Sequence, residues 1–171
     1  MLIGDLLKNS AKKFPEKIAV VLGQKELSFK ELNEKSNKVA NALLDVNLPK
    51  AINLAVLSAN HFDYPAIYFG AAKSGYVLAH LSTRFTNDEL VNVINKTDIG
   101  LIFVHGDVID NLLKIKNRMP GLSRIIVFGH NKPFEGNFSS LQDFINPGSK
   151  SEPNVSISPS DAFAITYTGG T

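Results

Sequence analysis

Short apolar runs alternate with segments of helical periodicity along most of this chain. The runs are almost continuously apolar, as expected for strands that are covered on both faces of a parallel sheet. We expect strands at 18–22, 51–57, 76–81, 100–104 and 124–128, and helices at 2–14, from 28 to just before Pro49, at 61–74, from 86 onward and at 107–117. This alternation predicts an α/β fold, a mostly parallel sheet with helices on both faces.

Local signals place several element boundaries. Ser28 and Glu31, and again Thr86 and Glu89, have the spacing of a capping box, in which the hydroxyl and the carboxylate each bond the other residue's backbone N–H. Gly75 follows the third helical segment and is expected to end it. Residues 25–27 are expected to pair with 18–22 as a hairpin, with residues 23 and 24 at the turn.

The composition changes after Gly129. Residues 130–160 contain four prolines, several Ser and Asn and few apolar side chains, so we expect a surface connection with one short helix capped at 139–142. Residues 161–171 then form a final strand and the start of a loop. The chain of 171 residues is thus expected to be a single α/β domain, 1–171, made of 1–129, the connecting segment 130–160 and the final stretch 161–171.

The loop at the end of the sequence carries the clearest chemical signal. Thr168, Gly169, Gly170 and Thr171 directly follow an apolar strand. Glycines allow backbone N–H groups to approach an anion, and Thr hydroxyls add donors, so the pattern is typical of a phosphate cradle. A plain turn at the end of a strand is the alternative for these four residues.

Composition excludes several function classes. There is no Cys, so a disulfide framework, a thiolate metal site and a cysteine nucleophile are excluded. The net charge is +2 and the lysines alternate with Glu, which is typical of a solvated helix face, so we expect no nucleic-acid partner. No apolar run is long enough to span a bilayer and no signal peptide is recognisable, so we expect no transmembrane segment and a cytoplasmic location. Walker, dinucleotide-binding and Ser-hydrolase motifs are absent, and the spacing of the four His suggests no metal site.

Three segments, taken in order, resemble the adenylate-forming superfamily, which includes acyl-CoA synthetases, luciferases and peptide-synthetase adenylation domains. Residues 27–32 (LSFKEL) resemble its early L-[TS]-[YF]-x-E-L segment. Residues 71–76 (AAKSGY) and 81–86 (LSTRFT) resemble its A-x-x-K-x-G segment and the arginine loop after it. Residues 167–171 (YTGGT) resemble the start of its phosphate loop, Y-T-[SG]-G-[TS]-T-G-x-P-K-G.

The resemblance implies an activity. A complete enzyme of this kind uses ATP and Mg²⁺ to activate a carboxylic acid as an acyl-adenylate, and then transfers the acyl group to CoA. Thr168, Gly169, Gly170 and Thr171 would hold the β- and γ-phosphates of ATP, while Tyr167 is expected to pack. The arginine loop looks more like that of acyl- and aryl-CoA synthetases, and the chain as a whole most resembles acyl-CoA synthetases and fatty-acid–CoA ligases. An amino-acid adenylation domain is the alternative within the superfamily.

Departures from the family pattern limit the expectation. His80 and Ser82 stand where members commonly have Pro and Asn. For Arg84, a structural salt bridge is favoured over a ligand contact. The sequence stops within the phosphate loop, so we assign no catalytic residue and no metal ligand and expect this chain alone to be inactive.

Two other classes of protein stay open: a stand-alone or split α/β nucleotide-binding or assembly module without ligase activity, and an unrelated nucleotide-binding domain. Under each of these interpretations, including the acyl-CoA synthetase, the last strand is expected to leave an open sheet edge, through which the chain would form a homo-oligomer.

Overall fold

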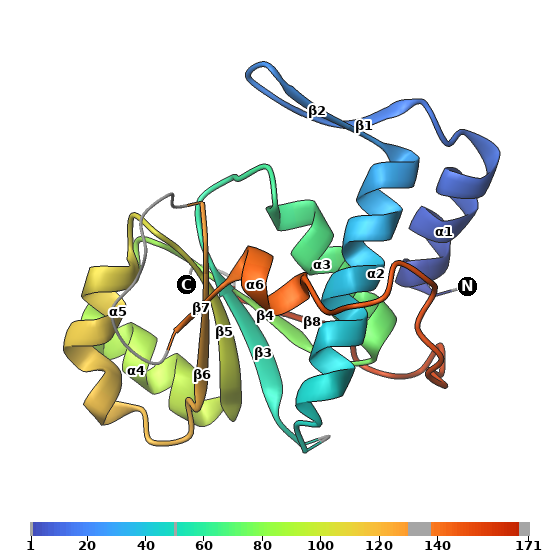
Figure 1. Ribbon diagram of the computed structural model, residues 1–171. Coiled ribbons are helices and arrows are strands. Elements are labelled where there is room, and N and C mark those ends of the chain that lie inside the picture. The colour runs from blue at the N-terminus through green and yellow to red at the C-terminus, as the bar shows by residue number, and fades with distance from the viewer. Residues whose placement is uncertain (1, 50, 130–137, 168–171) are drawn as a thin grey trace.

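A parallel sheet of six strands is the centre of the molecule (Figure 1). The computed structural model describes residues 2–49, 51–129 and 138–167. The strand order is β7-β6-β5-β3-β4-β8, and every neighbouring pair is parallel. The strands are β3 (Asn53–Leu57), β4 (Leu78–Leu81), β5 (Ile99–His105), β6 (Arg124–Phe128), β7 (Ser139–Ser140) and β8 (Ala164–Thr166).

Helices cover both faces of this sheet, and a hairpin stands beside it (Figure 1). The helices are α1 (Ile3–Lys13), α2 (Phe29–Val46), α3 (Tyr64–Ser74), α4 (Asn87–Lys96), α5 (Ile109–Ile115) and α6 (Leu141–Ile145), with a 3₁₀ turn at Lys116–Arg118. The separate antiparallel hairpin is β1 (Ile18–Leu22) and β2 (Lys25–Ser28). The predicted fold class, a mostly parallel sheet between layers of helix, is confirmed.

The two faces are built by alternate residues of the same strands. In β5, Leu101 and Phe103 pack with α2, α3 and α6, whereas Ile102 and Val104 pack with α4 and α5. Successive side chains of a strand point to opposite faces, so both sets must be apolar when both faces are covered. This is why the strands appear as uninterrupted apolar runs in the sequence.

The helix boundaries follow the predicted capping chemistry. Ser28 Oγ accepts from the N–H of Glu31 at 3.2 Å, and the Glu31 carboxylate accepts from the N–H of Ser28 at 2.8 Å. Thr86 and Glu89 form the same reciprocal pair at the start of α4. Gly75 ends α3 with a φ of +78°, a backbone conformation that costs glycine little. These boundaries therefore need no tertiary contact to be specified.

The helices α2 and α3 pack closely because of one glycine. A Cβ at Gly70 would lie 2.4 Å from Cγ1 of Val39 and 3.1 Å from the carbonyl oxygen of Ser36. No other residue type fits there without moving one of the helices. The small residues that the sequence clusters in 70–72 therefore serve this contact.

The connecting segment is held to the core by an ion pair between a buried lysine and a half-buried glutamate. Lys73 Nζ, on α3, donates to the carboxylate of Glu152 at 2.8 Å and to the amide oxygens of Asn33 and Asn37 at 2.7 Å each. Burial lowers the pKa of Lys73, and the neighbouring Glu152 opposes that shift. For Glu152, burial alone would raise the pKa, but the hydrogen bonds from Lys73 and Asn33 outweigh it and lower the pKa. The lowered pKa keeps Glu152 ionised at neutral pH, and its carboxylate favours the charged form of Lys73.

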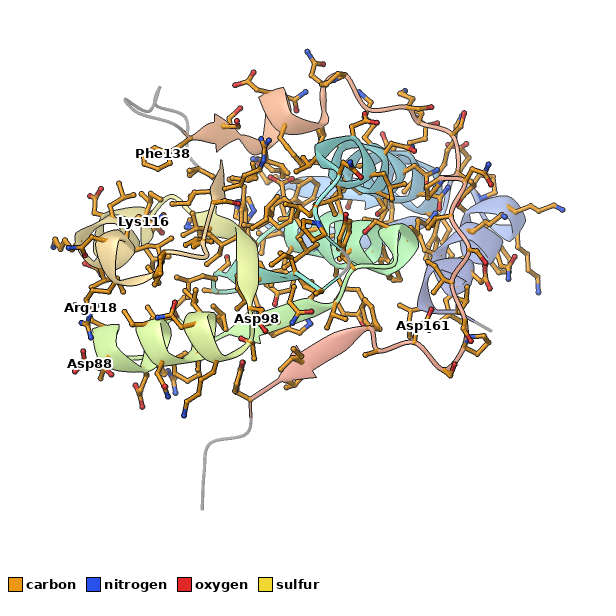
Figure 2. All side chains as sticks on the ribbon, turned by 90° about the horizontal axis from the view of Figure 1, so that it is seen from below. Asp88, Asp98, Lys116, Arg118, Phe138 and Asp161 are labelled. Atoms are coloured by element: carbon orange, nitrogen blue, oxygen red, sulfur yellow. The ribbon has the colours of Figure 1, made fainter. Side chains whose placement is uncertain are left out.

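The final strand lies at one edge of the sheet. β8 pairs only with β4 within the described part of the chain, and Ala164 and Thr166 are exposed. Figure 2 shows Asp161 in the turn before β8, where its carboxylate accepts from the N–H of Ser158 at 2.8 Å. The open edge is present as expected, while self-association through it stays a prediction. Among the described helices, none is both long and apolar enough to cross a membrane.

Candidate functional site

The loops that can carry function leave the sheet at the carboxyl ends of its strands, not along the lateral edge formed by β8. Because all six strands are parallel, their carboxyl ends lie at a single edge, where ligands commonly bind in open α/β sheets. The segments after Leu57, Leu81, His105, Phe128 and Thr166 all leave the sheet there. This carboxyl edge is the candidate functional site.

The strand before the predicted phosphate loop, β8, ends at this edge. Thr166, the last residue of β8, pairs with His80 of β4. Thr168, Gly169, Gly170 and Thr171 lie outside the described residues, so their role stays a prediction.

Tyr167, directly before the predicted loop, packs as expected. Its hydroxyl donates to Oγ1 of Thr97 at 3.2 Å, and its ring meets that of Phe85 edge-on at 6.1 Å. The chain is thereby anchored one residue ahead of the predicted phosphate contacts.

The arginine loop lies beside the start of the predicted phosphate loop. Phe85, which contacts Tyr167, is the neighbour of Arg84. Two segments of the sequence resemblance, 81–86 and 167–171, are thus brought together at their described residues. Arg84 is exposed, and no ion pair joins it to any residue of the described ranges, so the favoured structural salt bridge is not found there.

The first segment of the resemblance, residues 27–32, has a structural role. Leu27, Phe29 and Leu32 pack against Ala66 and Phe69 of α3 in a small cluster away from the sheet. Ser28 and Glu31 form the cap of α2. This segment fixes the hairpin and α2 rather than contributing to the carboxyl edge.

His80 occupies an aromatic pocket near β8. The hydroxyl of Tyr64 and Nδ1 of His80 are hydrogen-bonded at 2.6 Å, and the two rings stack at 6.0 Å. Tyr68 lies 5.7 Å from His80 and meets Phe163 edge-on at 4.9 Å. Burial lowers the pKa of His80, so the ring is neutral at pH 7. The residue that departs from the family pattern therefore has a packing role here.

Two further histidines meet at the carboxyl edge. His61 follows β3 and His105 ends β5, and their ring centroids are 4.9 Å apart. Beside them lies a cavity of about 330 Å³, lined in part by His61, Asp63 and Lys35. The spacing of the four histidines in the sequence suggests no metal site and does not predict that these two meet. The sequence signal that could have indicated this meeting is the pattern His-x-Asp, which occurs shortly after β3 and again at the end of its neighbour β5.

Solved structures share this fold at low sequence identity. The crystal structure of the anthranilate CoA ligase AuaEII in complex with anthranoyl-AMP superposes with a TM-score of 0.90 at 19% identity, covering 99% of this chain and 32% of that one. A long-chain-fatty-acid-CoA ligase from Archaeoglobus fulgidus gives 0.87 at 24% identity, covering 100% and 35%. The architecture therefore matches the N-terminal part of adenylate-forming enzymes.

Sequence relatives agree. A medium/long-chain-fatty-acid–CoA/3-oxocholest-4-en-26-oate–CoA ligase of Mycolicibacterium smegmatis is 24% identical over 99% of this chain and 31% of its own length. Long-chain fatty acid transport protein 6 of the mouse is 26% identical over 98% of this chain and 28% of its own. The chain thus spans about a third of the length of these relatives. Residues 7–171 match the sequence model described as AMP-binding enzyme, so this chain belongs to the AMP-binding enzyme family.

Proposed function

We propose that this chain forms the N-terminal part of an ATP-dependent acyl-CoA synthetase. In the first step, a carboxylate oxygen of the acid attacks the α-phosphorus of ATP, and the bond to pyrophosphate breaks. In the second step, the CoA sulfur attacks the acyl carbon, the thiol proton is lost, and AMP leaves. Support comes from the family membership and from relatives named as CoA ligases.

The observation that carries this proposal is the direction of β8. This strand runs parallel to β4, so Tyr167, the residue before the Thr/Gly segment, lies at the carboxyl edge next to the loop that carries Arg84. Charge builds on phosphoryl oxygens during adenylation, and catalysis depends on donors positioned against them. A strand end fixed by packing supplies such positioning.

Each residue of the loop has a proposed role. Thr168 and Thr171 donate hydroxyl hydrogen bonds to the β- and γ-phosphates, and Gly169 and Gly170 offer backbone N–H groups. The exposed Arg84 is available to an anionic part of a substrate. Within the described residues there is no cluster of three or more His, Asp or Glu that suits a metal, so we assign none of them to Mg²⁺. The metal would neutralise phosphate charge when bound.

The 171-residue chain is proposed to be inactive on its own. It covers about a third of the length of the ligase that it resembles. The single-domain organisation and the cytoplasmic location expected from the sequence stay predictions.

The test is carboxylate-dependent ATP–pyrophosphate exchange. The complete product of the gene that encodes this chain is assayed with medium- and long-chain fatty acids, aryl acids and amino acids, in parallel with the 171-residue chain. We expect exchange with fatty or aryl acids for the complete product and none for the 171-residue chain.

Three other outcomes would change the proposal. Exchange that depends only on amino acids would favour the adenylation-domain alternative. Exchange by the 171-residue chain would refute its inactivity. A folded complete product that binds ATP but exchanges with no acid would favour a nucleotide-binding module.

A further inference from the structure

The histidine pair lies where the strand order of the sheet reverses. From β3 the chain continues to β4 on one side, then crosses to β5 on the other side of β3 and goes on to β6. In open α/β sheets, the crevice outside the carboxyl ends of two such strands is the usual place for a ligand. His61 and His105 stand after β3 and at the end of β5, on the two sides of this crevice.

The same nitrogen of both rings, Nε2, lies close to Gly129. A Cβ at residue 129 would lie 2.1 Å from Nε2 of His105 and 3.0 Å from Nε2 of His61. Gly129 has a φ of +69°, so the backbone also favours glycine there. Phe128 flanks both rings, with centroid distances of 5.3 and 5.6 Å. The two Nε2 atoms therefore lie near each other beside Gly129, a residue that also lines the adjoining cavity.

Hydrogen bonds to Nδ1 of each ring determine which nitrogen carries the proton. The backbone N–H of Asp63 donates to Nδ1 of His61, and that of Asp107 to Nδ1 of His105, each at 3.2 Å. A backbone N–H can only donate, so each Nδ1 accepts, and the proton of the neutral ring is on Nε2. The side-chain carboxylates lie farther away, at 3.8 and 3.4 Å, and would pair with Nδ1 if a ring became charged. In either state both Nε2 atoms are donors.

The adjoining cavity adds positive charge and room. Its volume is about 330 Å³, and its lining includes Lys25, Lys35, Ser140 and Gln142. Lys25 and Lys35 supply the two ammonium groups at this cavity, and Lys35 forms an ion pair with Asp63. Burial is the main cause that lowers the pKa of His61; Asp63 opposes this shift, and His105, Lys25 and Lys35 add to it. A pair of imidazole N–H donors beside ammonium groups suits a multivalent oxyanion.

We propose that this crevice binds the phosphate group of a small phosphorylated molecule, with Nε2–H of His61 and of His105 as its central donors. The cavity exceeds the volume of a phosphate group and has apolar lining from Val127, Phe128 and Leu141, so it accommodates a small organic part as well. The crevice lies between β3 and β5, and β4 separates it from the predicted ATP phosphate loop after β8. It is thus a second anion site on the same edge.

A divalent metal is the competing occupant of two imidazoles. A metal needs the lone pair of Nε2, which requires the proton on Nδ1. That proton would meet the N–H groups of Asp63 and Asp107, which already point at Nδ1. The local backbone therefore favours an anion over a metal.

The test is imidazole NMR of the ¹⁵N-labelled chain of 171 residues. Long-range ¹H–¹⁵N spectra report the tautomer of each histidine, with assignments from His61→Phe and His105→Phe. We expect the Nε2–H tautomer for both. Inorganic phosphate should shift both signals saturably, acetate should bind more weakly, and the signal of His80, which is bonded to Tyr64, should not move.

Variants separate binding from general structural effects. Each His→Phe change should weaken phosphate binding about tenfold, the effect of losing one hydrogen bond to a charged group. Gly129→Ala should do the same by displacing His105. The proposal is overturned by the absence of a saturable phosphate shift, by equal binding of acetate, by unchanged affinity in both folded His→Phe variants, or by Zn²⁺ binding with the protons moved to Nδ1.

Discussion

Glu152→Gln tests how the connecting segment is held to the core. The substitution keeps the shape of the side chain but leaves the ammonium of Lys73, whose side chain is 3% exposed, without a counter-charge. Removing one partner of a fully buried pair costs about 3–5 kcal/mol. Here Glu152 is 32% exposed, and Asn33 and Asn37 still accept from Nζ, so we expect a loss of about 2–3 kcal/mol in the free energy of unfolding.

The chain supplies a matched control for this variant. Glu34 pairs with Nζ of Lys150 at 2.8 Å, the distance found for Glu152 and Lys73, and its side chain is likewise 32% exposed. The two pairs differ in the lysine, because Lys150 is 65% exposed. Glu34→Gln should therefore cost less than about 0.5–1 kcal/mol.

Urea unfolding followed by circular dichroism measures both changes. In thermal melts, the expected melting-temperature shift for Glu152→Gln is about 4–12 °C downward in a chain of this size, and that for Glu34→Gln is less than about 4 °C. Equal losses in the two variants would refute the reasoning, because burial of the lysine would then have no effect on the cost.

Three further predictions address pH, packing and assembly. The pKa of Glu152 is lower in the folded state, so its contribution to stability is complete above the unfolded-state pKa of about 4.3 and is lost as pH falls through the folded-state pKa. Thermal melts should therefore show a melting temperature that falls in acid, and Glu152→Gln should reduce this fall. Gly70→Ala should lower the free energy of unfolding by about 1–3 kcal/mol because the added methyl group clashes with Val39, although alanine favours helices. The control Gly121→Ala has open space around it and should be close to neutral in urea unfolding. A stabilising effect of Gly70→Ala would contradict the packing account. Light scattering should find a dimer or larger oligomer that a Thr166→Lys change on the β8 edge weakens, and a clean monomer at high concentration would contradict it.

Local chemistry explains what the sequence alone predicted. The caps at Ser28 and Thr86 depend on residues three positions apart, and the left-handed end of α3 depends on Gly75 alone. The apolar runs predicted their strands because alternate residues meet different helix layers on the two faces. Such features are fixed by neighbouring residues and can be inferred without tertiary information.

Contacts between distant residues could not be predicted in the same way. Lys73 and Glu152 are 79 positions apart, and the second lies in a segment whose composition suggested a surface connection. β7 consists of Ser139 and Ser140, which have no apolar pattern, and it forms only because β6 offers a free edge. The meeting of His61 and His105 depends on strand order, which the periodicity of single segments does not contain.

The most direct test of the proposed function concerns the loop after β8. In the complete gene product, ATP–pyrophosphate exchange is measured for Thr168→Val and Thr171→Val, with Tyr167→Phe as the control because that hydroxyl bonds only Thr97 among the described residues. Loss of a donor to developing phosphate charge should reduce exchange by about 10²-fold in each Thr variant, while the control stays close to the unmodified enzyme. Exchange that is unchanged in both Thr variants would contradict the assignment of this loop to the phosphates of ATP.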